Sequence, residues 1–280
     1  MRLTSDQLTQ FDESGFLFFD SLFTEQEMTV LNAETPGIFA QHRPENVRES
    51  GSGAVRTSFG VHMYNAVFAR LARHPRLVEP ARQLFREDVY MHQFKVNAKA
   101  AFDGDVWQWH QDFGTWQVAD QMPEPRAMNI AIFLNEVSEL NGPLMFVPGS
   151  HKLGVIDADL DTETTSYPLW TLNNDTVRKL VERGGIVVPK GPAGSMIMFD
   201  SLLVHGSGSN LSPWDRNTVY LSLCAISNHI RQFKRPAYLA QRDFEPIECL
   251  PDDCLLKQYD VTLPWIDGTP ESALNPQIAA

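Results

Sequence analysis

Six short segments rich in β-branched, aromatic and other apolar residues occupy much of the chain between Val89 and Ser227. In order they read VYMHQFKVNAKA (89–100), MNIAIFLNEV (128–137), GPLMFVPGS (142–150), GIVVPK (185–190), GSMIMFD (194–200) and NTVYLSLCAIS (217–227). Turn residues separate these segments, and almost no helical pattern lies between them. Because parallel strands need long crossover connections, the pattern predicts an antiparallel sandwich or barrel, a mainly β fold with flanking helices.

The part of the chain before this region, about residues 1–88, has mainly helical patterns. The segment TEQEMTVLNAE begins with Thr24 and Glu27 at the spacing of a capping box. Apolar residues recur at helical intervals over residues 65–85, with an interruption at Pro75. We expect these helices to pack on the β core, which should extend over about residues 89–235.

One helical pattern interrupts the β region. The segment DTVRKLVERGG, within residues 152–184, reads as a helix that ends at Gly184 and Gly185. We interpret the segment as an insertion over one mouth of the barrel. The chain has neither an internal repeat nor a long Gly/Ser linker, so we expect a single domain over residues 1–280.

Charge and apolar content narrow the expected partners. The net charge of −12 and a pI of about 5.1 argue against nucleic acid, because binding to phosphates needs clustered Lys and Arg. No stretch approaches the roughly 20 apolar residues that span a bilayer, so we expect no membrane partner and a cytoplasmic location. Three scattered cysteines suggest no disulfide framework. The expected partner is a small molecule, and the sequence leaves a homodimer open.

Two imidazoles and one carboxylate form a candidate metal site. His110 and Asp112 are two residues apart, so on an extended strand both side chains would point to the same face. A second imidazole, His205, follows the apolar segment at 194–204. Two His and one carboxylate make the facial triad of non-haem iron enzymes, which leaves three positions open for a co-substrate and O₂. An isolated His-x-Asp pair is usually only a surface pair, so the flanking residues must support this interpretation.

The residues after His205 give that support. Arg216 follows His205 by eleven residues at the start of the next predicted strand, and Ser207 lies in the connecting loop. An Arg can bind a distal carboxylate in a bidentate manner, and a Ser hydroxyl can add a hydrogen bond. A dicarboxylate such as 2-oxoglutarate would be held in this way.

From about Asp12 to Arg231, the chain resembles the phytanoyl-CoA dioxygenase family of Fe(II)/2-oxoglutarate oxygenases. The resemblance rests on the segment NGPLMFVPGSHK and on five residues around it: His110, Asp112, His205, Ser207 and Arg216. The segment WHQDFGTWQVADQMPEPR is similar to the signature of its ectoine hydroxylase branch. The resemblance implies a double-stranded β-helix, the jelly roll of cupin-like enzymes. It also implies hydroxylation of a C–H bond with Fe(II), 2-oxoglutarate and O₂. The implied metal ligands are His110, Asp112 and His205, and the implied 2-oxoglutarate residues are Arg216, Ser207 and Asn97.

The resemblance also implies a substrate side. In HQFKVNAK the polar residues Gln93, Lys95 and Asn97 alternate with apolar ones and form one face of a strand. Members of the ectoine hydroxylase branch carry Gln and Asn at the positions of Gln93 and Asn97, which face substrate and 2-oxoglutarate respectively. The substrate-binding residues implied on this basis are Gln93, Lys95, Trp107, Thr115 and Trp116. For Trp107, however, strict strand alternation predicts the face opposite His110, unless a bulge or strand end intervenes.

Two departures from the ectoine branch bear on the substrate. The position of Lys95 is typically Arg in that branch, and the position of Trp107 is typically Phe. A Lys suits a substrate carboxylate or phosphonate, and an indole face attracts a cationic nitrogen. We therefore expect a small polar metabolite with a cationic nitrogen, either an amino acid, a betaine-like compound or an aminophosphonate, and we rank ectoine lower.

Two alternatives from other classes use the same residues. A metal-dependent cupin-type isomerase or hydrolase could bind a metal through the triad without 2-oxoglutarate, and Arg216→Ala would then leave most of its activity intact. A non-catalytic binding module could keep the fold as a scaffold, although a complete ligand set argues against it.

Overall fold

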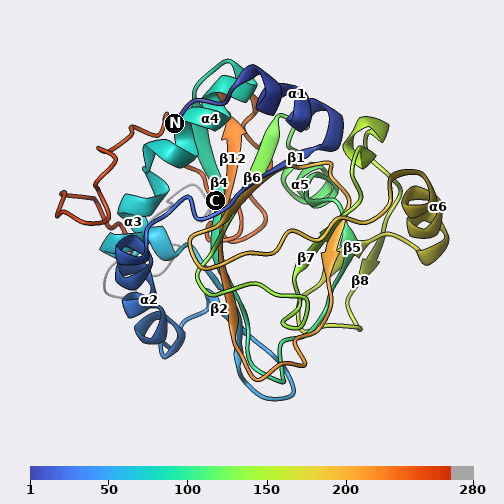
Figure 1. The fold of residues 1–280 in the computed structure, drawn as a ribbon, viewed down its shortest axis with the longest axis horizontal. Coiled ribbons are helices and arrows are strands. Elements are labelled where there is room, and N and C mark those ends of the chain that lie inside the picture. Colours follow the sequence, from blue (N-terminus) through green and yellow to red (C-terminus); the bar gives the residue numbers. More distant parts are fainter. Residues whose placement is uncertain (266–280) are drawn as a thin grey trace.

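A large antiparallel sheet runs through the molecule, which is described over residues 1–265 by a computed structural model (Figure 1). Its strands, in spatial order, are β1 (Phe16–Phe19), β10 (Met196–Asp200), β6 (Ala127–Phe133), β12 (Arg216–Ala225), β4 (Val89–Lys99), β3 (Val55–Phe59) and β2 (Asn46–Arg48). A smaller antiparallel sheet has the order β5 (Trp107–His110), β11 (His205–Ser207) and β7 (Leu144–Phe146). Spatial neighbours are mostly distant in sequence, so the chain crosses repeatedly between the sheets.

The two sheets form a jelly roll, which confirms the fold predicted from the sequence. Apolar side chains fill part of the space between them: Phe146 of the small sheet stacks on Phe16 at 5.3 Å between ring centroids and lies 5.2 Å from Phe199 of the large sheet. The rest of the space between the sheets is lined by polar residues and holds the candidate site. Apolar packing at one end therefore fixes the separation of the two walls of the site.

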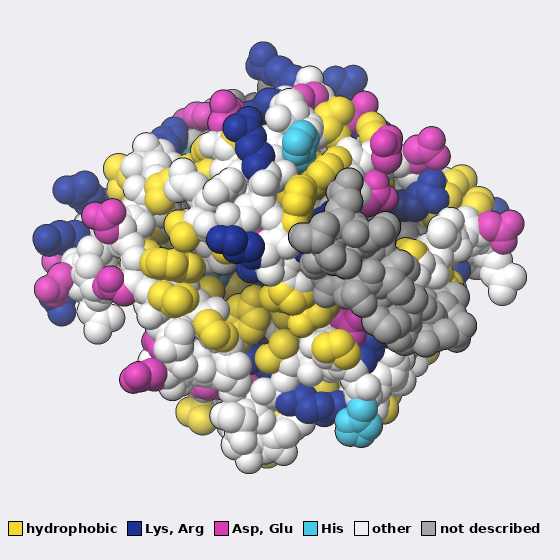
Figure 2. All heavy atoms as spheres, turned by 180° about the vertical axis from the view of Figure 1, so that it is seen from behind, with side chains coloured by type: hydrophobic (Ala, Val, Ile, Leu, Met, Phe, Trp, Pro, Cys, Tyr) yellow, Lys and Arg dark blue, Asp and Glu magenta, His cyan; other side chains and the backbone are white. Residues whose placement is uncertain are grey.

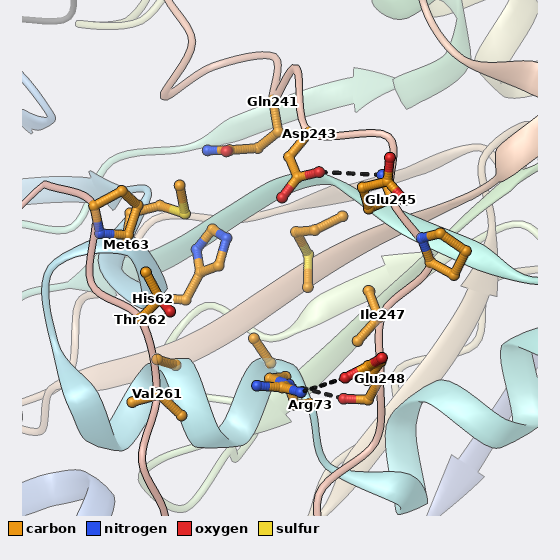
Figure 3. Close-up of a pocket in the computed structure, with 15 residues that line it drawn as sticks. His62, Met63, Arg73, Gln241, Asp243, Glu245, Ile247, Glu248, Val261 and Thr262 are labelled. Atoms are coloured by element: carbon orange, nitrogen blue, oxygen red, sulfur yellow. Dashed lines mark hydrogen bonds and ion pairs between the residues drawn. The ribbon is translucent and has the colours of Figure 1, made fainter. Parts of the chain in front are cut away.

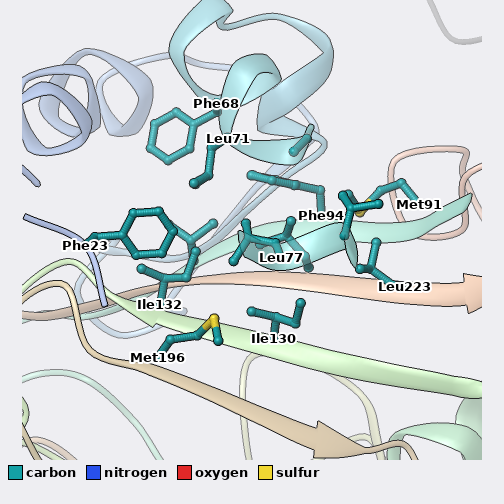
Figure 4. Packing of buried hydrophobic residues seen from close by; sticks show 14 of the residues in the cluster. Phe23, Phe68, Leu71, Leu77, Met91, Phe94, Ile130, Ile132, Met196 and Leu223 are labelled. Carbon is teal, nitrogen blue, oxygen red and sulfur yellow. The ribbon is translucent and has the colours of Figure 1, made fainter. Parts of the chain in front are cut away.

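Helices cover the outer face of the large sheet. They are α1 (Ser5–Ser14), α2 (Glu25–Phe39), α3 (Ala66–Ala72) and α4 (Pro75–Phe85), with the short 3₁₀ helix η1 (Val61–Met63) before α3. The predicted capping box is present, since the Thr24 hydroxyl accepts from the Glu27 amide and the Glu27 carboxylate accepts from the Thr24 amide. Figure 4 shows the main apolar core between this layer and the sheet, where Phe68 and Leu71 of α3 face Phe94.

Strand β6 shows why both faces of the large sheet are buried. Met128, Ile130 and Ile132 pack in the core beneath the helices, whereas Ala131 and Phe133 pack in the core between the two sheets. Side chains alternate along a strand, so one short apolar segment supplies residues to both cores. The near-continuous apolar run at 128–134 is the sequence signature of this double burial.

The insertion predicted at 152–184 lies beside the small sheet. It contains the two-stranded sheet β8 (Asp159–Asp161) and β9 (Leu169–Thr171), followed by α6 (Asn174–Gly184), which confirms the predicted helix. Two further 3₁₀ helices are η2 (Ser150–Leu153) and η3 (Ile226–Asn228). Backbone hydrogen bonding joins the insertion to the small sheet, because the Leu172 amide donates to the Trp109 carbonyl at 2.8 Å.

Three expectations need correction. The segment at 185–190 forms only one isolated bridge, Val187 with Phe146, and Gly191 just after it forms another with Val137. Pro189 and Pro192 lie in or beside the segment and cannot donate ladder hydrogen bonds. The N-terminal part also contributes β1, β2 and β3 to the large sheet, which its mainly helical pattern did not predict. Finally, a helix, α5 (Asp112–Asp120), follows β5 where no helix was expected.

Figure 2 shows the face opposite to Figure 1. Hydrophobic side chains gather near its middle, while Lys and Arg side chains are scattered among Asp and Glu, mostly toward its edge. Among residues 1–265, no helix combines the length and the apolar character that crossing a membrane requires.

Candidate active site

The three predicted metal ligands converge between the two sheets. His110 is the last residue of β5, His205 is the first residue of β11, and the two residues form a pair in the register of the small sheet. One donor atom from each of His110, Asp112 and His205 lies within 4.8 Å of the other two. The Asp112 oxygens lie 3.6 Å from His110 Nε2 and 3.5 Å from His205 Nε2. This spacing fits three ligands of one ion.

Hydrogen bonds orient each ligand toward that common point. His110 Nδ1–H donates to the Gln108 carbonyl at 2.6 Å, and His205 Nδ1–H donates to the Leu203 carbonyl at 2.9 Å. Each Nε2 is therefore left with its lone pair, as a metal ligand needs. Asp112 Oδ2 accepts from Asn129 Nδ2 at 2.8 Å, and Asn129 Oδ1 accepts from the Ser222 hydroxyl at 2.6 Å. The residues fit a divalent metal in both donor type and orientation.

The electrostatics favour a neutral His205 and an ionised Asp112. Burial, and to a smaller extent the neighbouring His110, lowers the pKa of His205 to about 4, so this imidazole is neutral at pH 7. Burial opposes ionisation of Asp112 most strongly, but His205, His110 and Lys95 together hold the pKa of this carboxyl below its usual value. Two neutral imidazoles and one carboxylate are the protonation states that bind iron.

Asp112 reaches the site by a different route from the predicted one. Strand β5 ends at His110, and Asp112 is the first residue of α5, so the two ligands do not share a strand as expected. Gln111 between them is extended, with φ of −117° and ψ of 130°. One extended residue preserves the alternation of side chains, so Asp112 still points to the same side as His110. The predicted proximity is therefore correct, although the predicted element is wrong.

A β-bulge decides the position of Trp107. The register pairs His110 with His205 and Trp107 with Ser207, so β5 takes three steps where β11 takes two. The extra residue places Trp107 on the same side as His110, against strict alternation. Its ring lines the pocket and contacts Tyr167 at 5.6 Å between centroids. Of the two positions that the sequence left open for Trp107, the structure has the one in the pocket.

Ser207 and Asn97 line the pocket, and Arg216 lies beside it, next to the lining residue Tyr220 on strand β12. Arg216 is buried; its guanidinium donates to the Gly142 carbonyl at 2.7 Å and to the Thr218 hydroxyl at 3.2 Å. Within residues 1–265, Arg216 Nε and Ser207 Oγ are both buried without a hydrogen-bond partner. Unpaired buried donors are costly, so an arginine Nε–H and a hydroxyl left free fit the carboxylate of a bound ligand. Asn97 lines the pocket, and its Oδ1 accepts from the Thr57 hydroxyl at 3.0 Å.

All five residues predicted for the substrate side also line this pocket. They are Gln93 and Lys95 from β4, Trp107 from β5, and Thr115 and Trp116 from α5. Gln93 Nε2 donates to the Leu239 carbonyl at 2.6 Å, which ties the segment after η3 to the site. Trp116 is packed edge-on against His92, at 4.8 Å between ring centroids. The structure thus brings every sequence-predicted site residue into or directly beside one pocket.

Sequence reasoning missed six further residues that line the pocket, among them the polar residues Tyr167, Tyr220 and Arg235. Tyr167 comes from the insertion and Arg235 from the segment after η3, so neither lies near a metal ligand in sequence. The Arg235 Nε donates to Asp120 at 2.8 Å, and Asp120 is fully buried. Tyr220 could have been found, because it follows Arg216 and Thr218 on the inward face of β12.

A His, Asp and His triad held between the two sheets of a jelly roll is the arrangement typical of non-haem iron oxygenases. The phytanoyl-CoA dioxygenase family matches residues 11–218. An ectoine dioxygenase from Bordetella bronchiseptica is 37% identical over 257 residues, covering 86% of this chain and 83% of that protein. An L-proline trans-4-hydroxylase from Streptomyces griseoviridis is 34% identical over 252 residues, covering 86% of this chain and 94% of that protein.

A solved structure extends the likeness to three dimensions. EctD from S. alaskensis, crystallised with 2-oxoglutarate and 5-hydroxyectoine, has a TM-score of 0.80 and 32% identity, covering 89% of this chain and 87% of that chain. Another structure of the same protein contains bound Fe and has a TM-score of 0.78. The chain therefore belongs to the phytanoyl-CoA dioxygenase family, in its ectoine hydroxylase-like branch. It is an Fe(II)/2-oxoglutarate-dependent dioxygenase that acts as a hydroxylase, with O₂ as the second co-substrate.

Proposed function

We propose that the enzyme hydroxylates a small metabolite that carries both an acidic group and a cationic nitrogen. Amino acids, betaine-like compounds including ectoine, and aminophosphonates belong to this class. Lys95 carries the proposal: it lines the pocket, its Nζ lies 5.5 Å from the Tyr220 ring centroid, and no described residue forms an ion pair with it. Burial lowers the pKa of this amine, so an anionic substrate group would stabilise its charged form.

The remaining lining residues support the same class. Arg235 is held by Asp120 on one edge and brings a second cation to the pocket wall. The rings of Trp107, Trp116 and Tyr167 line the pocket as well, and such faces attract a cationic nitrogen and exclude water. We infer that the acidic group lies toward Lys95 and Arg235, and that the nitrogen lies toward the aromatic rings.

The co-substrate residues follow from their free donors. We infer that Arg216 and Ser207 bind the distal carboxylate of 2-oxoglutarate, with Asn97 beside it, and that His110, Asp112 and His205 hold the iron. Iron with 2-oxoglutarate and O₂ supplies the oxidising chemistry that breaks the C–H bond. The protein orients the substrate, excludes water and keeps the His205 imidazole neutral.

The relatives change the ranking of candidate substrates. The sequence ranked ectoine lower because Lys95 and Trp107 depart from its branch. The names of two relatives refer to ectoine and L-proline. Each of these compounds joins a carboxylate to a nitrogen-containing ring, so both fit the proposed class. We therefore place ectoine and L-proline first among compounds to test. The cytoplasmic location and a homodimer stay predictions from the sequence.

The test is succinate formation by the Fe(II)-loaded enzyme with 2-oxoglutarate and each candidate, with mass spectrometry of the product. A gain of one oxygen with ectoine, L-proline or another member of the class supports the proposal. Lys95→Met should raise the KM for that substrate roughly tenfold or more, with little change in the KM for 2-oxoglutarate. Equal turnover of the corresponding amide, which has no negative charge, would contradict the inferred role of Lys95.

A further inference from the structure

A second cavity lies away from the active site, on the helix side of the large sheet. It has a volume of about 630 Å³, within the usual range for small-molecule sites. Its floor consists of Ala69 and Ala72 of α3 and Met91 of β4, all buried. The opposite side is formed by the chain segment 241–248, and the rim by Val261 and Thr262. Figure 3 shows these parts surrounding the cavity.

One buried polar group in this cavity lacks a partner. Gln241 is 3% exposed and lines the cavity, and its Nε2 forms no hydrogen bond within residues 1–265. Its backbone is fixed, because the Gln241 amide donates to the His92 carbonyl at 2.8 Å. A buried amide donor without an acceptor costs free energy, because it has lost its hydrogen bond to water without replacement. A ligand oxygen in the cavity would remove that cost.

His62 is the second unpaired polar group. Its ring packs against Phe94 at 4.7 Å between centroids, and its Nδ1 is buried with no hydrogen-bond partner in the described chain. Burial lowers the pKa of His62 to about 3, so the imidazole is neutral at pH 7 and does not repel a cation. Figure 3 shows Gln241 and His62 on the same side of the cavity.

The mouth of the cavity is acidic. Asp243, Glu245 and Glu248 line it, and its one arginine, Arg73, is paired with Glu248 at 3.4 Å. Asp243 accepts from the Glu245 amide at 3.1 Å, which holds the two residues in one turn. Asp243 and Glu245 are thus left with negative charge facing solvent at the opening, in a chain whose net charge is already −12.

We propose that this cavity is a second small-molecule site, which binds an organic amine carrying a carbonyl or hydroxyl oxygen. The oxygen accepts from Gln241 Nε2 in the interior. The apolar linker lies on Ala69, Ala72 and Met91, and the ammonium group lies among the carboxylates at the mouth. None of these residues lines the active-site pocket, so the site is separate from the hydroxylation reaction.

The test is calorimetric titration of the purified full-length chain with N-acetylputrescine, which joins an amide carbonyl to an ammonium group through an apolar linker. Putrescine lacks the carbonyl and N-butylacetamide lacks the charge, so both should bind more weakly. Gln241→Met should weaken N-acetylputrescine binding about tenfold, and the double variant Asp243→Asn/Glu245→Gln about threefold. Thermal unfolding of each variant checks that the fold is intact.

The active site could also take an amine, so Trp116→Ala is the matched control and should leave binding unchanged. Equal binding of N-acetylputrescine and N-butylacetamide would overturn the proposal. So would binding that is lost in Trp116→Ala and unchanged in the double variant, because the probe would then occupy the hydroxylation site. The double variant changes only exposed side chains, so it stays informative if Gln241→Met fails to fold.

Discussion

The active-site pocket has one wall of long, regular strands and one wall of short, interrupted strands. On the large sheet, β4 and β12 pair over ten residues with one register shift, between Gln93 and Met91, and the unbroken ladder from Gln93 to Lys99 aligns Gln93, Lys95 and Asn97 along one face. On the small sheet, β5 and β11 pair at only two positions with a bulge between them. The regular wall carries groups for recognition, whereas two of the three metal ligands lie at the ends of the short strands.

The difference has a physical reason. A long ladder keeps its side chains at fixed intervals, which suits several polar groups that contact one extended ligand. Three ligands of one ion must converge instead, and strand ends, bulges and helix starts turn side chains toward a common point. Asn129 joins the two walls, since it lies on β6 and donates to Asp112.

We expect the largest loss of Fe(II) binding and turnover when a metal ligand on the interrupted wall is replaced. His205→Ala should abolish stoichiometric Fe(II) binding and lower turnover on the order of a thousandfold or more, because two ligands cannot hold the ion. Anaerobic titration with Fe(II) and 2-oxoglutarate, followed by the visible charge-transfer band, checks the loss. His229→Ala, an exposed imidazole outside the pocket, is the matched control. Normal iron binding by His205→Ala would refute the ligand assignment.

A substitution on the regular wall should weaken the binding of 2-oxoglutarate and leave the binding of Fe(II) unchanged. Arg216→Met should raise the KM for 2-oxoglutarate roughly 100-fold, because a buried carboxylate would lose its charged partner. Arg216→Lys should restore little, since an ammonium group lacks the planar fork of arginine. Steady-state kinetics, with Fe(II) binding measured in parallel, would distinguish the contribution of the regular wall from that of the interrupted wall. An unchanged KM in Arg216→Met would show that Arg216 does not bind the distal carboxylate of 2-oxoglutarate.

Replacing Asn129, which joins the two walls, should have an intermediate effect on Fe(II) affinity. Asn129→Ala removes the hydrogen bond to Asp112 and should weaken Fe(II) binding about 10- to 100-fold, as changes around metal ligands typically do. Asn135→Ala is the control, because this residue follows the same strand and binds the Asn217 amide outside the pocket. If the two variants bind Fe(II) equally well, Asn129 does not position Asp112.

We expect the smallest effect, a modest loss of substrate binding, when Trp107 at the bulge is replaced. Trp107→Phe should weaken substrate binding about three- to fivefold, because a phenyl ring attracts a cation less strongly than an indole. The variant also loses part of the contact with Arg56, whose guanidinium carbon lies 4.1 Å from the Trp107 ring centroid. The KM values for substrate and 2-oxoglutarate, measured together, should show a change in the first alone. A change in iron affinity instead would mean that Trp107 supports the metal site.

The sequence by itself determined the antiparallel β core, the capped helices, the metal ligands and the polar face of β4. These features depend on local spacing: the two-residue step from His110 to Asp112, the two-residue alternation at Gln93, Lys95 and Asn97, and the Thr24 and Glu27 capping box. A period of two or three to four residues survives in any tertiary arrangement, so these patterns are visible without a structure.

Only the tertiary structure decided the side on which Trp107 lies, the helix that begins at Asp112, and the inclusion of Tyr167 and Arg235 in the pocket. The bulge exists because β5 must match β11, a strand about 95 residues further along the chain. Tyr167 and Arg235 enter the pocket because an insertion and the segment after η3 fold back over it. Such positions depend on contacts between distant segments, which leave no periodic signal in the sequence.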